Sequence, residues 1–313
     1  MCRPREAGAR DTAAGKVEPS PVRLLVLGGT LSALAVVASV ACGSSSDEAP
    51  VASAAVTLSP TRAAGGAPVQ VHYRLEAVAG STMPAGNHIV FVHWVAPSGE
   101  LLWTDDHEPP VPLQQWRPGT PIEYDRTMFV PRISVAGPVQ VQVGIYSPAD
   151  GKRLPLTGET AGTRAYPVAT LEIRPDPSSV FVAFGEGWHN PEVGQALGRE
   201  WRWSRATGHL AFRNPQRPAE LWLELDQPVK ALSAPQQVEL RIGGTVVDTF
   251  TLPPGTLQIH RTPLTVETMG AGETVELEIV PSESFVPANI PALKSGDRRT
   301  LGVRIFNAHL AVH

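Results

Sequence analysis

The segment FGEGWHNPEVGQALGREWRWS, residues 184–204, gathers three of the seven tryptophans of the chain. Aromatic rings stack on the apolar faces of sugar rings while polar neighbours bind the hydroxyls, so this composition favours a ligand-binding surface. The candidate ligand-binding residues are Trp188, His189, Asn190 and Glu192. The alternative for Trp188 is packing in a core, where large aromatic side chains are mostly found. Trp201 and Trp203 are two residues apart and share one face of a strand, which we expect to point inward.

Three glutamates of the same segment, Glu186, Glu192 and Glu200, could serve a glycan-active enzyme. Glycoside hydrolysis needs two carboxyl groups about 5 Å or about 6.5 to 9.5 Å apart across a cleft. Glutamates beside glycine and proline are more often solvated loop residues. The sequence also has no Gly-x-Ser-x-Gly turn for a nucleophile. We therefore expect no catalytic residue and keep the enzyme as the alternative.

Asp105, Asp106 and His107 form the densest group of potential metal ligands, just before Pro109 and Pro110. Carboxylates and an imidazole in one loop could hold a divalent cation. Short aspartate side chains also commonly bind exposed backbone groups in loops, and we favour this structural role. No metal and no cofactor is therefore expected.

Near the other end of the chain, the segment SGDRRTLGVRI places Asp297, Arg298 and Arg299 before a final strand. Arginine pairs well with carboxylates because its planar guanidinium donates two parallel hydrogen bonds. These three residues could bind a carboxylate or an acidic glycan, but we favour an ion pair at the start of the last strand. We also predict that Arg298 pairs instead with one of the three glutamates of residues 184–204. Such a pair would tie the two ends of the second domain together.

The N-terminal residues have the anatomy of an export signal, with basic residues before the apolar run LLVLGGTLSALAVVASVAC. The end of this run, with Cys42 followed by a serine-rich stretch, resembles the lipobox of bacterial lipoproteins. The resemblance implies a signal peptide over 1–41, acylation of the Cys42 thiol and a lipidated flexible tether over 42–53. Acyl chains would then hold an exported protein on a bacterial membrane. The alternative is an uncleaved signal anchor.

Composition points to strands rather than long helices, since 31 prolines and 28 glycines separate short runs rich in valine, leucine and threonine. The net charge is −4 and the basic residues are dispersed, so a nucleic-acid partner is not expected. Residues 54–175 contain about seven such runs, among them VQVHYRL and VQVQVGIY, which predict an immunoglobulin-like β-sandwich. After a linker near 173–180, residues 180–313 predict a second, jelly-roll-like β-sandwich. We therefore expect an all-β chain of two tandem sandwiches.

Longer motifs carry a second resemblance. FVHWVAPSGELLWTDDHEPPVP and the following runs are similar to an accessory β-sandwich in extracytoplasmic parts of bacterial membrane glycosyltransferases. GEGWHNPE, WRWS and DRRTLGVRI are similar to a jelly-roll module of the same proteins. The resemblance implies two non-catalytic envelope modules, with glycan or a membrane protein as partner. A scaffold of an envelope complex is the remaining alternative.

Overall fold

The computed structural model of the chain describes residues 48–132, 135–175, 180–194 and 199–313. The expected signal segment, Cys42, the tether up to residue 47 and the centre of the expected linker lie outside the described residues. Among those described, no helix is long and apolar enough to cross a membrane. The described chain is nearly all β-structure, which confirms the all-β prediction.

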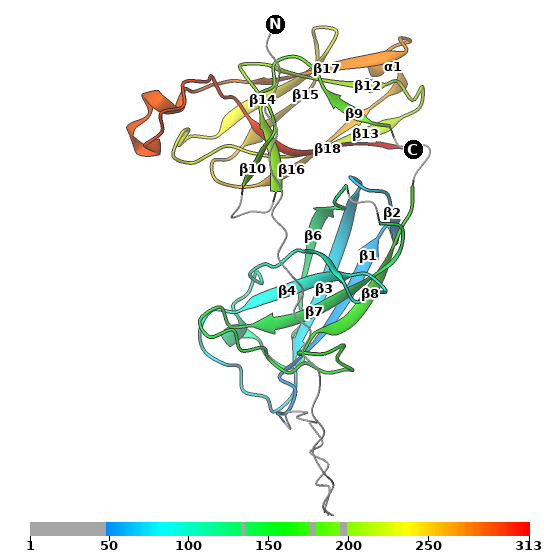
Figure 1. The fold of residues 1–313 in the computed structure, drawn as a ribbon, viewed down its shortest axis with the longest axis vertical. Helices are drawn as coiled ribbons and strands as arrows, with labels where there is room; N and C mark the ends of the chain where they lie inside the picture. The colour runs from blue at the N-terminus through cyan, green and yellow to red at the C-terminus, as the bar shows by residue number, and fades with distance from the viewer. Residues whose placement is uncertain (1–47, 133–134, 176–179, 195–198) are drawn as a thin grey trace, which may run out of the picture. The chain divides into compact units, whose positions relative to one another are not determined.

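In the described part of residues 48–175, eight strands form two sheets, drawn from blue to green in Figure 1. Their bounds are β1 (Ala52–Ser59), β2 (Arg62–Ala63), β3 (Pro68–Ala77), β4 (Ile89–Val95), β5 (Leu101–Thr104), β6 (Ile122–Phe129), β7 (Gly137–Tyr146) and β8 (Tyr166–Ile173). Three strands pair in the order β1-β3-β6, and five pair in the order β2-β8-β7-β4-β5. The seven runs expected from sequence are all strands, and the sequence did not predict β2.

The core of this first sandwich follows the period of two that the sequence shows. Val69, Val71, Tyr73 and Leu75 of β3 are all wholly buried, while the polar residues between them are not. Alternation along a strand sends successive side chains to opposite faces, so one face of β3 packs against the other sheet.

Ten strands of the described residues after 180 form two five-stranded sheets, coloured green to red in Figure 1. Their bounds are β9 (Val182–Phe184), β10 (Glu192–Gly194), β11 (Arg199–Trp203), β12 (Gly208–Arg213), β13 (Ala219–Asp226), β14 (Gln236–Ile242), β15 (Thr245–Leu252), β16 (Gln258–Leu264), β17 (Thr274–Pro281) and β18 (Arg304–Val312). One sheet has the order β15-β14-β17-β12-β9 and the other has the order β10-β11-β18-β13-β16. The last strand, β18, therefore lies inside its sheet, between β11 and β13.

The core of the second sandwich shows which face of β13 points away from it. Leu221, Leu223 and Leu225 of β13 are wholly buried in it. Because side chains alternate, the residues between these leucines point to the outer face of the sheet. That outer face carries the candidate site described below.

Turns and short helices connect the strands. Gly243 and Gly244 join β14 to β15 with φ angles of 57° and 79°, the left-handed geometry that a two-residue hairpin turn needs. The helices of the described residues are single turns: η1 (Leu113–Gln115), α1 (Val266–Met269), η2 (Pro287–Asn289) and η3 (Pro291–Leu293). Within the described residues, no sheet combines strands from both sides of 174–181. The domain bounds and the immunoglobulin-like and jelly-roll-like topologies stay predictions.

Candidate functional site

Trp188 is built into the second sandwich. Its backbone forms an isolated antiparallel β-bridge with Ser204. Its indole N–H donates a hydrogen bond of 2.8 Å to the backbone oxygen of His209. The ring meets Phe184 edge-on at 5.0 Å between ring centres and packs against the second core. A Cβ atom added to Gly208 would lie only 2.6 Å from the same ring. Trp188 is half-buried, and these neighbours hold its ring at the edge of the core.

His189 and Asn190 follow Trp188 along the loop. The backbone N–H of His189 donates to Trp203 at 2.9 Å, and its ring Nε2 lies 2.8 Å from the backbone oxygen of Thr300. Because a carbonyl oxygen only accepts, Nε2–H is the donor in this bond. Asn190 is exposed. The histidine thus holds the loop to the segment before β18.

Glu192, in contrast, reaches a charged group across the sheet edge. Its carboxylate lies 2.8 Å from the Arg299 guanidinium and accepts the indole N–H of Trp201 at 3.2 Å. Hydrogen bonds from Arg299 also hold the pKa of Asp297 below its usual value. The prediction for Arg298 was wrong in its residue, since its neighbour Arg299 makes the tie. The conformation of the loop determines which of the two arginines reaches Glu192, and this conformation cannot be read from the sequence.

The candidate carboxylates of residues 184–204 do not all share a face. Glu192 stands opposite Trp201 in the β10-β11 pair, and Glu200 stands opposite Val193. Cross-strand partners point to the same side while neighbours along a strand point to opposite sides. Glu192 and Glu200 therefore lie on opposite faces of the pair. Glu186 is exposed before β10.

The outer face of the second sheet brings together charged side chains that lie far apart in the sequence. Arg304 of β18 donates to both carboxylate oxygens of Asp226 of β13, at 2.8 and 2.6 Å. Glu224 forms an ion pair with Arg199 of β11 and accepts the side-chain amide of Asn307 at 2.5 Å. Three adjacent strands thus contribute paired charges.

Aromatic rings lie between these charges. The guanidinium carbon of Arg304 is 5.2 Å from the ring centre of Trp201, 5.4 Å from that of Trp203 and 4.9 Å from that of Phe306. Guanidinium groups are attracted to aromatic faces at these distances. We call this surface the Trp-Arg face, and its members are Arg199, Trp201, Trp203, Trp222, Glu224, Asp226, Arg261, Arg304, Phe306 and Asn307.

The Trp-Arg face has a buried floor and an accessible rim. Glu224 is 5% exposed and Trp222 is 7% exposed, although both point away from the core. Trp201 and Phe306 are half-buried, and the side chain of Arg261 is 48% exposed over Trp222. Each floor charge has a partner that fixes its rotamer. The arrangement can therefore present preorganised donors, acceptors and ring edges to a polar ligand.

The placement predicted for Trp201 and Trp203, in the core or at its mouth, agrees with the burial of Trp203, but the sheet face is not the expected one. The two residues share a face, as their spacing predicts, but that face is the outer one. Trp203 is buried in a small separate cluster with Phe285 and Leu301, and Trp201 packs against that cluster. The spacing of two is the same for either face, so only the pairing of β11 with β18 reveals which face is used.

The sequence pattern alone does not reveal most of the Trp-Arg face. The signal is the segment AELWLELD of β13, in which leucines alternate with Trp222, Glu224 and Asp226. A tryptophan and two acidic residues on the side of a strand that faces away from the core indicate a surface that could bind a ligand. The partners of these acids come from strands distant in sequence, so the pattern alone could not show the cluster.

The group at Asp105–His107 has internal partners in the first sandwich. Asp105 accepts two hydrogen bonds from Arg126, at 3.0 and 2.7 Å, and Asp106 accepts the backbone N–H of Val92 at 3.1 Å. In the described ranges there is no group of three acidic, histidine or cysteine side chains placed to hold a metal ion. The three residues connect strands to the loop that carries them.

His107 is buried with both ring nitrogens bonded. Nδ1–H donates to the backbone oxygen of Asp105 at 2.8 Å, so Nε2 accepts the hydroxyl of Tyr124 at 2.8 Å. Burial is the main cause that lowers the pKa of His107 below its ordinary 6.5, and the charge of Arg126 acts in the same direction. The folded state therefore holds this histidine neutral.

This burial predicts a loss of stability in mild acid. Between the two pKa values of His107, the unfolded chain binds a proton that the folded chain does not, so the free energy of unfolding falls as pH drops below about 6.5. We expect urea unfolding at pH 7.5 and pH 5.5 to show a smaller pH effect for His107→Gln than for the wild type. Equal pH effects in the two proteins would contradict this assignment.

Comparison with known proteins finds similarity only to solved structures. No protein-family model matches the chain, and no curated protein matches it. The DNA glycosylase AlkC of Pseudomonas fluorescens is 14% identical, with a TM-score of 0.25 over 41% of this chain and 31% of that one. A family 43 arabinoxylan arabinofuranohydrolase from Bacillus subtilis is 12% identical, with a TM-score of 0.27 over 83% and 54%. The β-glucuronidase of Bacteroides uniformis is also 12% identical, at 0.27 over 80% and 28%. The chain thus matches about half or less of each, and the likenesses carry no functional conclusion.

Proposed function

We propose that the chain is a non-catalytic glycan-binding module and that the Trp-Arg face is its binding surface. One observation carries the proposal: half-buried Trp201 and Phe306 flank a fixed array of carboxylate, amide and guanidinium groups. Sugar hydroxyls accept hydrogen bonds, so they can bind the guanidinium and amide groups that the carboxylates hold in place. Aromatic rims supply the apolar contact that a sugar ring needs.

The balance of charge supports a neutral glycan as the ligand. Arg304 is matched by Asp226, Arg199 by Glu224, and the exposed Arg261 by Glu220. A face whose cations are matched one by one has no excess charge to attract an anion. A neutral, hydroxyl-rich chain would lose little on entering it, because the polar groups of the floor are already paired.

The ion pairs made by the carboxylates of the Trp-Arg face support a role in binding rather than in catalysis. A general acid for glycoside hydrolysis must hold and release a proton at the bond that is cleaved. Glu224 and Asp226 are buried, and each is already paired with a guanidinium group, that of Arg199 and that of Arg304. Their role in the proposal is to orient Arg199 and Arg304.

Replacing Trp201 tests the proposal directly. We expect Trp201→Ala to weaken binding of the best ligand from a glycan array by about 10- to 100-fold, the effect of removing an aromatic anchor. Trp201→Phe should retain part of the affinity because it keeps a ring. Phe181→Ala removes an exposed aromatic side chain outside this face and is the matched control. If wild-type protein binds no glycan, or Trp201→Ala binds like wild type, the proposal fails.

We also propose that the protein is exported and held on a bacterial membrane by acyl chains on Cys42. The proposal rests on the lipobox-like end of the N-terminal apolar run. Cys42→Ser should leave the full chain unprocessed or release it from the membrane fraction, and metabolic labelling with palmitate should be lost. Labelling that persists in this variant would contradict acylation at Cys42.

A further inference from the structure

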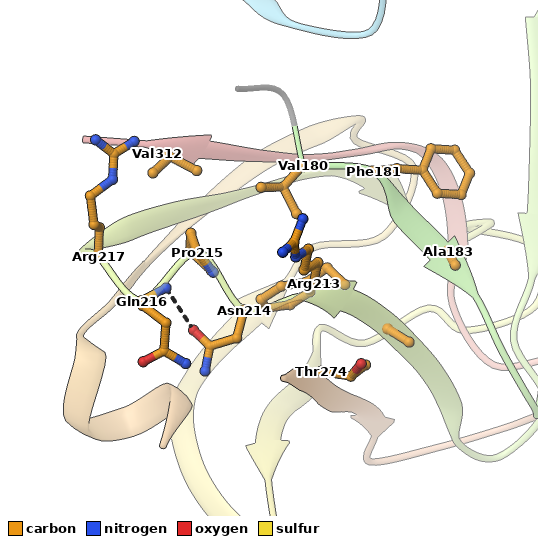
Figure 2. A pocket seen from close by; sticks show the side chains of 12 residues that line it. Val180, Phe181, Ala183, Arg213, Asn214, Pro215, Gln216, Arg217, Thr274 and Val312 are labelled. Atoms are coloured by element: carbon orange, nitrogen blue, oxygen red, sulfur yellow. Dashed lines mark hydrogen bonds between the residues drawn. The ribbon is translucent and has the colours of Figure 1, made fainter. Parts of the chain in front are cut away.

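A pocket lies on the sheet of the second sandwich that does not carry the Trp-Arg face, the sheet β15-β14-β17-β12-β9. It is an open pocket of about 800 Å³ beside β9 and β12, within the size range of small-molecule sites (Figure 2). It includes no member of the Trp-Arg face. The pocket therefore needs an explanation of its own.

Small residues create this hollow. Ala183 of β9 stands opposite Ala211 of β12, and both point outward because the adjacent Val182 and Phe212 are buried in the core. Two methyl groups cover far less of a sheet than the long side chains that usually stand there. The pair forms an apolar floor that a ligand can reach.

The walls of the pocket are also apolar. Val180, Val312 and Phe181 line it, and Phe181 is 68% exposed. A phenylalanine side chain that is mostly exposed does not contribute the free energy that its burial would provide. An aliphatic chain lying on the alanine floor would cover this ring.

Two arginines of the same pocket have no acidic partner among the described residues. Arg213 and Arg217 are both exposed and are drawn among the lining side chains in Figure 2. The arginines of the Trp-Arg face, in contrast, are all ion-paired. Unpaired guanidinium groups beside an apolar surface favour a ligand that brings its own negative charge.

The loop that carries these arginines is held in place by Asn214. Its buried side chain donates to the backbone oxygens of Gly270 and Gly272, at 2.9 and 3.0 Å. Its oxygen accepts the backbone N–H of Gln216 at 3.0 Å, the bond drawn as a dashed line in Figure 2. Because the loop is already held in place, it loses less conformational entropy when a ligand binds Arg217.

We propose that this pocket binds an amphipathic anion, an aliphatic chain that ends in a carboxylate or phosphate. The chain lies on the floor of Ala183 and Ala211 under Phe181, and the head group is held by Arg213 and Arg217. This site is separate from the Trp-Arg face and does not depend on glycan binding.

Titration calorimetry of the full chain with dodecanoate, dodecyl phosphate and neutral dodecanol tests the proposal. We expect either anion to bind at least about ten-fold more tightly than dodecanol, since a charge-assisted hydrogen bond contributes that much. The stronger of the two anions identifies the head group. Anions that bind no better than dodecanol would overturn the proposal.

Variants locate the binding in this pocket. Ala183→Leu fills the floor and should lower dodecanoate affinity at least about ten-fold, the cost of displacing several methylene contacts. Arg213→Gln combined with Arg217→Gln should bring the anions down to the level of dodecanol, and it remains informative if the leucine variant does not fold. Arg298→Gln, which removes an exposed arginine elsewhere, should bind like wild type. Wild-type affinity in both pocket variants would overturn the proposal.

Discussion

Alanine in place of Asp226 will lower the free energy of unfolding by about 3 to 5 kcal/mol, the cost of leaving a buried charge without its partner. The side chains of Asp226 and Arg304 are only 13% and 20% exposed, so solvent screens this pair weakly. Two parallel hydrogen bonds join them. Without the carboxylate, the Arg304 guanidinium remains among three aromatic rings with no anion to balance it.

Urea unfolding followed by tryptophan fluorescence measures this effect. A double-mutant cycle with Arg304→Met is the matched control, because methionine removes the charge while filling part of the space. The two losses should not add: the double variant should be more stable than Asp226→Ala alone, since no orphaned charge remains. A loss below about 1 kcal/mol for Asp226→Ala would show that the pair behaves like an exposed surface pair.

The same pair links the stability of the sheet to the shape of its outer face. Arg304 contacts Trp201, Trp203 and Phe306, so its position decides where these rings stand. Loss of Asp226 removes the two hydrogen bonds that hold the guanidinium in this position. We infer that Asp226 positions the rim of the Trp-Arg face rather than touching ligand itself.

Local patterns in the sequence were enough to predict most of the strands, although not the two-residue strand β2. Alternation in VQVHYRL and in AELWLELD reflects the two faces of one strand, and each such run is a strand in the structure. Gly243 and Gly244 likewise determine a turn through their own backbone freedom. These features depend on neighbours a few residues away.

Predictions that needed the pairing of strands could not be made from the sequence. Asp226 meets Arg304 because β13 pairs with β18 across 78 residues. The face to which Trp203 points depends on the pairing of β11 with β18. The sequence also could not distinguish Arg298 from Arg299 as the partner of Glu192. The segment before β18 is irregular, so no period along the chain predicts which way its side chains point.

Trp188 is the residue for which the sequence left two roles open, and its replacement separates them. We expect Trp188→Ala to destabilise the protein by about 3 kcal/mol, because the change removes a large ring from the core edge and leaves a cavity. The backbone oxygen of His209 also loses its indole donor. Glycan affinity of the folded variant should stay at the wild-type value, because the ring lies outside the Trp-Arg face.

Two further variants show that packing is the cause. Trp188→Phe keeps an aromatic ring against Phe184 but lacks the N–H donor, so it should lose less stability than alanine. Gly208→Ala should also destabilise the fold, since its Cβ would lie 2.6 Å from the ring and force Trp188 to move. A Trp188→Ala protein of unchanged stability that no longer bound glycan would make Trp188 a contact residue. That result would move the binding surface from the Trp-Arg face to the loop before β10.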